Sequence, residues 1–379
     1  MSKKFYIKSL GCKVNRAEAD DFAAYLLENG WEFSSSEEAD LILINTCTVT
    51  HTAEKKTRKA VKSLCTTNKK AKIILTGCSC VIHSDFYKSL DSRIEIISKK
   101  DLDVGCASIL ANEKFRTRAS IKIQDGCDNA CTYCIVHVAR GKSVSLDKKF
   151  IINRFNELSD SGVKEVVLTG VNLGAYNDLC GLLTELLHSD TRIRLSSIEP
   201  QNLTDDIIDL IADSDGKICR HLHLPLQSGS SRILKKMARH YNADEYLSLV
   251  YKLREKIPTI ALSTDIIVGF PGEDSSDFKQ SFDLCNKCGF MKIHVFPYSV
   301  RVGTPAAIMP NQIPEDIKQK RAKNLRELSK NLAIKDFNAR KGSSELVLVE
   351  SKEVSRTESY HTIASPKASK PGELISVIL

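Results

Sequence analysis

Short apolar runs alternate with amphipathic stretches along the first hundred residues. The runs lie at residues 4–10, 41–45, 72–76 and 93–97, and apolar positions recur at helical spacing over stretches such as 17–27 and 53–64. Alternation of strands and helices is typical of a parallel sheet covered by helices. We therefore expect a parallel α/β domain over residues 1–110.

A second alternation follows a polar stretch at residues 111–118, which we interpret as a linker. Its predicted strands are 121–125, 165–169, 192–198, 221–226, 262–268 and 292–298, with helical segments between them. A closed barrel needs eight strand–helix units, so six units predict a partial (β/α)6 barrel.

The rest of the chain contains a charged helix and a β-rich tail. Leu325, Leu328 and Leu332 mark the apolar stripe of a helix over residues 313–340, which completes a domain of residues 117–340. The tail, residues 341–379, has predicted strands at 346–349, 361–363 and 374–379. About forty residues bury too little surface to fold alone, so we expect the tail to pack against the rest of the chain.

Composition narrows the compartment and the chemistry. No apolar run approaches the ~20 residues of a membrane helix, and the strand pattern begins too early for a signal peptide, so we expect a cytoplasmic protein. In that reducing compartment the 13 cysteines favour metal or iron–sulfur ligation over a disulfide framework. The net charge of +8 permits a nucleic-acid partner without requiring one.

The most specific cysteine motif is Cys127-x3-Cys131-x2-Cys134, directly after the first predicted barrel strand. Barrel enzymes place their chemistry at this end of the strands. Three thiolates from one loop can hold three irons of a [4Fe–4S] cluster and leave the fourth iron open to a small molecule. A zinc knuckle with His137 as the fourth ligand is the alternative.

Three further cysteines, Cys12, Cys47 and Cys78, each end a predicted strand of the first domain. Parallel strand ends converge on one edge of a sheet, where ligands bind, so these thiolates predict a second cluster. Inert buried cysteines are the alternative. We interpret the remaining cysteines as packing or surface residues: Cys65, Cys80, Cys106, Cys180, Cys219, Cys285 and Cys288.

The motif of Cys127, Cys131 and Cys134, with Tyr133 before its last cysteine, resembles the signature of the radical S-adenosylmethionine (SAM) superfamily. The wider pattern resembles the methylthiotransferases of that superfamily over residues 4–340 and, more weakly, in the tail. The matching motifs are Gly11-Cys-Lys-Val-Asn15, Asn45-Thr-Cys-Thr-Val49, Thr76-Gly-Cys78, Gln124-Asp-Gly-Cys127, Val167-Leu-Thr-Gly-Val-Asn172, Ser197-Ile-Glu-Pro200, His223-Leu-Pro-Leu-Gln-Ser-Gly229 and Asp265-Ile-Ile-Val-Gly-Phe-Pro-Gly-Glu273.

This resemblance implies three modules. A Rossmann- or flavodoxin-like methylthiotransferase domain would carry an auxiliary [4Fe–4S] cluster on Cys12, Cys47 and Cys78. The partial barrel would hold a SAM-binding [4Fe–4S] cluster on Cys127, Cys131 and Cys134. The tail would be a shortened TRAM-like RNA-binding β-barrel. The implied reaction replaces C–H by C–S–CH3, with one SAM supplying the methyl group and another the radical, so the cofactors carry the catalysis.

The resemblance also points to a substrate. The Gly11–Asn15 motif followed by Glu18, together with Gly170–Gly174 and Tyr298–Thr304, resembles a subgroup that acts on tRNA. Its members methylthiolate C2 of N6-threonylcarbamoyladenosine at position 37, next to the anticodon. The alternatives are methylthiolation of an aspartate in ribosomal protein S12 and a non-catalytic iron–sulfur protein that binds RNA.

Several residues at the predicted strand ends are candidates for binding SAM. They are Tyr133, Gly170, Asn172, Ser197, Glu199, Gln227 and Gly269. Glu199 would hold ribose hydroxyls or the SAM amine, unless it only caps a helix before Pro200. Gly269 would let the backbone approach adenine, unless it only forms a turn. Ser228 would contact SAM or substrate, and Arg140 would bind a carboxylate or phosphate.

The implied partners are a tRNA substrate, an electron donor such as flavodoxin or ferredoxin, and a sulfur donor that the sequence does not identify. We expect a monomer without a membrane partner. A basic helix with Lys55, Lys56, Arg58, Lys59 and Lys62 would contact tRNA phosphates or form a solvated face.

Overall fold

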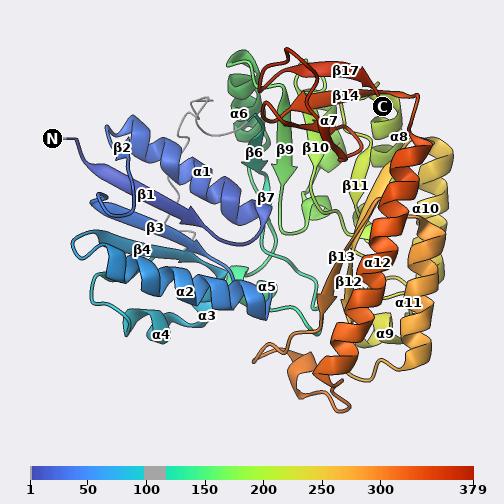
Figure 1. Cartoon of the computed structure of the whole chain (residues 1–379), viewed down its shortest axis with the longest axis horizontal. Helices are drawn as coiled ribbons and strands as arrows, with labels where there is room; N and C mark the ends of the chain where they lie inside the picture. Colours follow the sequence, from blue (N-terminus) through green and yellow to red (C-terminus); the bar gives the residue numbers. More distant parts are fainter. Residues whose placement is uncertain (1, 98–116) are drawn as a thin grey trace. The chain divides into compact units, whose positions relative to one another are not determined.

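The computed structural model describes residues 2–97 and 117–379 and divides them into two compact units (Figure 1). The first unit contains residues 2–97, 125–128 and 135–144, and the second contains residues 117–124, 129–134 and 145–379. Most of the predicted linker, the predicted boundary at residue 110 and Cys106 lie outside the described residues. The division into three domains therefore stays a prediction.

The first unit is a five-stranded parallel sheet with the strand order β2-β1-β3-β4-β5. The strands are β1 (Lys4–Ser9), β2 (Glu32–Phe33), β3 (Leu41–Thr46), β4 (Lys72–Gly77) and β5 (Ile94–Ile96). Its helices are α1 (Lys13–Glu28), α2 (His51–Thr67), α3 (Cys78–Ile82), α4 (Ser84–Lys88) and α5 (Val136–Arg140). Figure 1 shows α1 and α2 on opposite faces of this sheet. The predicted alternation is confirmed, and β2 is a short addition with exposed side chains.

The core of this unit forms because β3 and β4 are apolar along their length. Ile42 and Ile44 of β3 and Ile73 of β4 are fully buried, and they pack with Val61 of α2. Burial on both faces is typical of parallel strands. The two central strands therefore hold their carboxyl ends at one rigid edge.

The second unit contains six parallel strands in two three-stranded sheets, β10-β9-β6 and β11-β12-β13. They are β6 (Ala119–Lys122), β9 (Glu165–Thr169), β10 (Arg192–Leu195), β11 (His221–His223), β12 (Ala261–Val268) and β13 (Lys292–Pro297). A parallel bridge between Ser197 and His223 joins the two sheets. All six predicted strands are thus present, and neighbouring strands follow one another in the sequence, as in a partial barrel.

The other elements of this part of the chain cover those strands or connect them (Figure 1). The helices are α6 (Lys148–Asp160), α7 (Leu179–Leu186), α8 (Asp205–Asp213), α9 (Ser231–Lys236), α10 (Ala243–Lys256), α11 (Ser275–Cys288) and α12 (Glu315–Ala339). Short connecting elements are β7 (Gln124–Asp125), β8 (Val144–Ser145), η1 (Leu173–Ala175), η2 (Pro200–Asn202) and η3 (Pro305–Ile308). Leu325, Leu328 and Leu332 of α12 are buried, as their spacing predicts. No helix in residues 2–97 and 117–379 is long and apolar enough to span a bilayer.

The tail is a four-stranded antiparallel sheet with the order β16-β15-β14-β17. Its strands are β14 (Ser344–Val349), β15 (Val354–Thr357), β16 (Thr362–Ala364) and β17 (Leu374–Ile378). The strand β15 was not predicted because its sequence, Val-Ser-Arg-Thr, contains only one apolar residue. Ser355 and Thr357 are nevertheless fully buried, so small polar side chains line this part of the interior.

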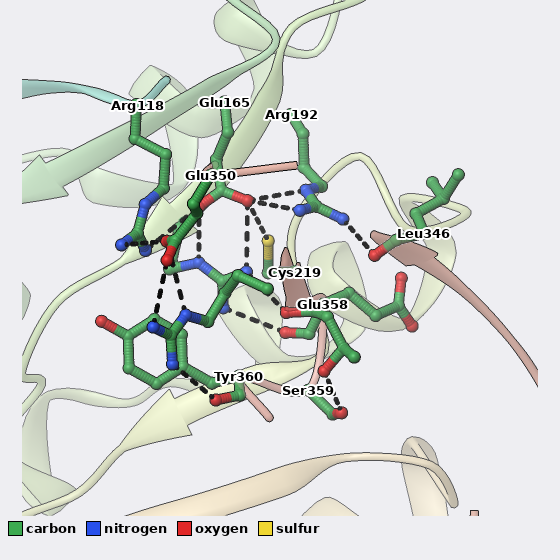
Figure 2. Close-up of polar contacts among 12 residues, drawn as sticks. Arg118, Glu165, Arg192, Cys219, Leu346, Glu350, Glu358, Ser359 and Tyr360 are labelled. Atoms are coloured by element: carbon green, nitrogen blue, oxygen red, sulfur yellow. Dashed lines mark hydrogen bonds and ion pairs between the residues drawn. The ribbon is translucent and has the colours of Figure 1, made fainter. Parts of the chain in front are cut away.

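The tail packs on the rest of the second unit through a buried cluster of charged residues, shown in Figure 2. Glu165, the first residue of β9, accepts from Arg192 Nε and Arg194 Nε, each at 2.8 Å. The same arginines donate to backbone carbonyls of the tail, Arg192 to Leu346 O at 2.7 Å and Arg194 to Glu358 O at 3.0 Å. These bonds confirm that the tail leans on the rest of the chain, and they place it at the amino ends of the parallel strands.

Candidate functional site

Cys12, Cys47 and Cys78 lie at the carboxyl ends of three neighbouring strands. Cys12 precedes α1 and follows β1, Cys47 follows β3, and Cys78 begins α3 directly after β4. These strands pair in parallel in the order β1-β3-β4. The fold therefore brings the three predicted ligands of the auxiliary cluster to one edge.

Two glycines allow the close approach of these chain segments. Gly11 has φ +108°, and a Cβ atom there would lie 2.6 Å from Cys47 Sγ. Gly77 has φ +97°, and its Cβ atom would lie 2.3 Å from Thr46 O. A side chain at either position would clash and would also strain the backbone. The glycines that precede Cys12 and Cys78 thus allow the three strand ends to pack closely together.

The chemistry of this edge fits an iron–sulfur cluster. Cys47 is 3% exposed, and burial, reinforced by the neighbouring Cys12 and Cys78, raises the pKa of its thiol to about 11. Iron would supply the positive charge that a buried thiolate needs. In the described part of the chain, the buried atoms Asn45 Oδ1 and Thr76 Oγ1 also have no hydrogen-bond partner, and both flank the cysteines.

Other cysteines have structural surroundings. Cys80 is fully buried in the core of the first unit, and its Sγ donates to Gly77 O at 3.2 Å. Cys285 and Cys288 are fully buried in α11, where burial raises the pKa of Cys288 to about 12. These surroundings agree with the packing role that we prefer for them.

Cys127, Cys131 and Cys134 share one loop after β7. Within the first unit, Cys127 N donates to Gly141 O at 3.1 Å. Within the second unit, Thr132 N donates to Met237 O at 3.1 Å, and Cys134 N donates to Cys131 O at 3.0 Å. Tyr133 packs edge-on against Phe270, with ring centroids 6.5 Å apart. The loop is therefore fixed at several points by its backbone.

Arg239 is a site residue that the sequence analysis missed. Its guanidinium, 2% exposed, donates to Cys131 Sγ at 3.3 Å and forms an ion pair with Glu199. Tyr241 OH accepts from Arg239 Nε at 3.0 Å and donates to Pro225 O at 2.6 Å. Arg239 thus joins a predicted cluster ligand to a predicted SAM-binding carboxylate.

The position of Glu199 decides between its two interpretations. It precedes η2, but its side chain makes no capping hydrogen bond. Its carboxylate faces Arg239 instead. Glu199 is therefore not a helix cap, and its predicted contact with SAM stays a prediction.

Gly170 and Asn172 lie beside the buried Gln124. Asn172 N donates to Gln124 Oε1 at 2.9 Å, and Asn172 Nδ2 donates to Asn202 Oδ1 at 3.2 Å. A Cβ atom on Gly170 would lie 2.9 Å from Gln124 Oε1. Among the described residues, the buried Asn172 Oδ1 has no hydrogen-bond partner, as expected of a group that holds a ligand.

The remaining candidates have mixed surroundings. Ser197 is half-buried, and Leu173 N donates to its carbonyl. Gln227 has φ +66° and pairs with β12 through its backbone. Ser228 is fully buried, 3.3 Å from Ser281 Oγ, so it serves packing. A Cβ atom on Gly269 would lie 2.3 Å from Lys318 Cγ, so packing against α12 already requires a glycine there.

The zinc alternative needs Cys127, Cys131, Cys134 and His137 around one ion. Cys127 and His137 belong to the first unit, whereas Cys131 and Cys134 belong to the second. The geometry within either unit therefore does not test this alternative.

Known proteins match both parts of this chain. Residues 121–285 match the radical SAM superfamily, and residues 4–97 match the uncharacterized protein family UPF0004. The chain is also similar in fold to the radical SAM methyltransferase TsrM from Kitasatospora setae. That similarity has a TM-score of 0.55 and 13% identity, and covers 81% of this chain and 75% of that chain. Fold and cysteine motif together define a radical SAM enzyme.

Relatives along the whole chain make the class more specific. The threonylcarbamoyladenosine tRNA methylthiotransferase MtaB of Thermotoga maritima is 36% identical, covering 92% of this chain and 87% of the relative. The tRNA-2-methylthio-N(6)-dimethylallyladenosine synthase of Alkaliphilus oremlandii is also 36% identical, covering 86% of this chain and 77% of the relative. The chain belongs to the radical SAM tRNA methylthiotransferase family.

Membership establishes the reaction class. The protein is an enzyme that transfers a methylthio group to tRNA. Enzymes of this family use SAM and two [4Fe–4S] clusters, so the predicted cofactors are confirmed. Which residues hold them stays a prediction for every residue named above.

Proposed function

We propose that the enzyme methylthiolates C2 of N6-threonylcarbamoyladenosine at position 37 of tRNA. The observation that carries this choice is the Gly11–Asn15 motif followed by Glu18, which resembles the subgroup with this substrate. The names of relatives from Thermotoga maritima and Bacillus subtilis give the same modification. In the structure, the side chains of Asn15 and Glu18 lie at the sheet edge that bears the three predicted ligands of the auxiliary cluster.

The proposed site assigns a task to each group of residues. Cys12, Cys47 and Cys78 would hold the auxiliary cluster, and Cys127, Cys131 and Cys134 would hold the SAM cluster. When bound, these cofactors supply the radical, the sulfur and the methyl group. Glu199, oriented by Arg239, would bind the SAM amine or ribose, and Asn172 Oδ1 would accept a hydrogen bond from the ligand.

The proposed function also requires an electron donor and a surface that binds tRNA. A flavodoxin or ferredoxin would donate electrons to the SAM cluster, and the enzyme would work as a cytoplasmic monomer. Lys55, Lys56, Lys59 and Lys62 of α2 are exposed, so they are available to tRNA phosphates. The tail would add an RNA contact.

The test is mass spectrometry of tRNA nucleosides from cells with and without the gene. We expect loss of 2-methylthio-N6-threonylcarbamoyladenosine and accumulation of its unmethylthiolated precursor. The wild-type gene should restore the nucleoside, and a Cys131→Ala gene should not.

Other outcomes separate the alternatives. If the methylthiolated dimethylallyladenosine nucleoside is lost instead, the substrate is the one named for the relative from Alkaliphilus oremlandii. Unchanged tRNA would contradict the proposal, and ribosomal protein S12 would be measured next. A protein that binds iron without cleaving SAM would match the non-catalytic alternative.

A further inference from the structure

Arg140 is a buried charge in the first unit that the proposed function does not use. It is the last residue of α5, and its side chain is 2% exposed. Helix α5 packs against α3, which begins with Cys78. Arg140 also follows Cys134 by only six positions in the sequence. The guanidinium therefore lies beside the auxiliary cysteines, on the segment that leaves the other cysteine loop.

Arg140 fixes the orientation of Asn15. Its Nη2 donates to Asn15 Oδ1 at 2.6 Å. The amide nitrogen of Asn15 then points the other way and donates to Leu10 O at 2.9 Å and Thr46 O at 2.8 Å. Those carbonyls belong to the segments that lead into Cys12 and Cys47. One oriented amide thus ties two cysteine-bearing segments together.

Arg140 also binds a carboxylate that reaches the same edge. Its Nη1 donates to Glu18 Oε1 at 3.1 Å and to Asp125 Oδ1 at 2.6 Å. The other oxygen of Glu18 accepts from Asn45 Nδ2 at 3.1 Å, and Asn45 Nδ2 also donates to Asn15 O at 2.9 Å. Arg140, Asn15, Glu18 and Asn45 therefore form one network behind Cys12 and Cys47.

The charge of Arg140 acts on the cysteines as well as on its hydrogen-bond partners. Burial disfavours the charged guanidinium, but Glu18, Cys78, Asp125 and Cys12 outweigh that effect and keep its pKa well above the usual value. The same charge acts on Cys47 to lower the pKa of its thiol, against the larger effect of burial. A buried positive charge stabilises negative charge nearby more strongly than an exposed one does.

We propose that Arg140 is a positioning residue that orders the auxiliary cluster site and raises its reduction potential. This inference rests on the proposed assignment of Cys12, Cys47 and Cys78 to that cluster. Reduction adds one negative charge to a cluster, so a fixed guanidinium favours the reduced form. Without the guanidinium, the half-buried carboxylates of Glu18 and Asp125 lose this positive charge, and their negative charge disfavours reduction.

The experiment measures the potential of the auxiliary cluster alone. The parent is the full chain carrying Cys127→Ala, Cys131→Ala and Cys134→Ala, reconstituted with iron and sulfide without oxygen. Arg140→Gln and Arg140→Lys are introduced into this parent. Lys142→Gln is the matched control, because it removes one positive charge from an exposed position on the same segment. Iron content and a redox titration followed by electron paramagnetic resonance are the two readouts.

We expect about four irons per chain in the parent, Lys142→Gln and Arg140→Lys. Arg140→Gln should lower the equilibrium constant for one-electron reduction at least tenfold, which corresponds to 59 mV. Arg140→Lys keeps the charge but not the planar fork, so its potential should stay nearer to the parent. The control should match the parent, since water and salt screen an exposed charge.

Distinct results would overturn the proposal. A fully loaded Arg140→Gln variant with the parent's potential would exclude a role for the charge. If Arg140→Gln assembles no cluster, Arg140→Lys provides the test. A tenfold lower equilibrium constant for reduction in Arg140→Lys would exclude the charge as the cause, because lysine keeps that charge. A parent without iron would instead refute the auxiliary site itself, and this inference would fall with it.

Discussion

The second unit buries an arginine–glutamate cluster at each end of its parallel strands. At the amino ends, Arg192 and Arg194 hold Glu165. At the carboxyl ends, Arg239 holds Glu199. Each cluster has a buried cysteine beside it, since Cys219 Sγ lies 3.8 Å from Glu165 Oε2 and Cys131 Sγ lies 3.3 Å from Arg239 Nη1. The same residue types thus occur in two places that we assign to different tasks.

The difference lies in what accepts the remaining arginine donors. At the amino ends, backbone carbonyls of the tail accept them. At the carboxyl ends, a tyrosine hydroxyl and a thiol sulfur accept them, and sulfur is a weak acceptor. The carbonyls complete a structural interface, whereas the sulfur that accepts from Arg239 belongs to Cys131, a predicted cluster ligand. Partners of a charged cluster therefore indicate its role better than its burial does.

The matched cysteines provide the largest test of this comparison. Cys131→Ala should abolish SAM cleavage and remove about four irons per chain, because it deletes a predicted ligand of the SAM cluster. Cys219→Ala should keep both and cost on the order of 1 kcal/mol of stability. Iron analysis and SAM cleavage under anaerobic conditions check both variants. SAM cleavage by Cys131→Ala at the wild-type rate would contradict the assignment.

Glu165→Gln should strongly destabilise the fold. The neutral amide leaves Arg118, Arg192 and Arg194 without their shared carboxylate, and breaking a buried ion pair costs about 3–5 kcal/mol. Thermal or urea unfolding measures the loss. Glu199→Gln is the comparison variant, and its smaller loss is expected because the Glu199 side chain is 16% exposed. Equal losses in the two variants would erase the distinction between the clusters.

Arg239→Lys should weaken SAM binding without unfolding the protein. Lysine keeps the charge but cannot reach Glu199, Tyr241 and Cys131 together. Loss of an oriented, charge-assisted hydrogen bond is worth about 1.5–3 kcal/mol, so half-maximal SAM cleavage should need roughly 10–100 times more SAM. Arg194→Lys is the control at the other end, with a lower melting temperature and an unchanged SAM requirement. An unchanged SAM requirement in Arg239→Lys would count against its positioning role.

Protonation of Glu165 at low pH should reduce the stability of the fold, with a smaller effect than the substitutions above. Burial opposes its ionisation, but Arg194 and Arg192 outweigh burial and hold the pKa of Glu165 well below its usual range. A lowered folded-state pKa gives stability that is complete above the unfolded value, near 4.5, and is lost as the pH falls below it. One proton corresponds to a slope of at most about 1.4 kcal/mol per pH unit. Below pH 4.5, the free energy of unfolding of the wild type should fall more steeply than that of Glu165→Gln, by this slope. Parallel unfolding titrations of the two proteins measure the difference.

Local patterns were sufficient to predict the main parallel strands of both units and the edge where Cys12, Cys47 and Cys78 lie. The runs containing Ile42, Ile44 and Ile73 are apolar because both faces of β3 and β4 are buried. Cys12, Cys47 and Cys78 could be grouped because parallel strand ends meet at one edge. Whether they ligate a cluster still needs the experiments above.

Long-range contacts could not be predicted in the same way. Arg239 lies 108 positions from Cys131, and Arg194 lies 164 positions from Glu358. No local spacing relates residues that meet only after folding. Glu199 was ambiguous for the same reason, because the arginine that takes its carboxylate is 40 positions away. The strand β15 was missed because buried serine and threonine have no apolar signature.

The interface with the tail has a consequence for how the sequence can change. Arg192 and Arg194 recognise Leu346, Thr357 and Glu358 by their carbonyl oxygens, which every amino acid possesses. A substitution at these positions that fits the local packing would leave those hydrogen bonds in place. The outward side chains of the tail can therefore diverge while the docking of the sheet is inherited unchanged.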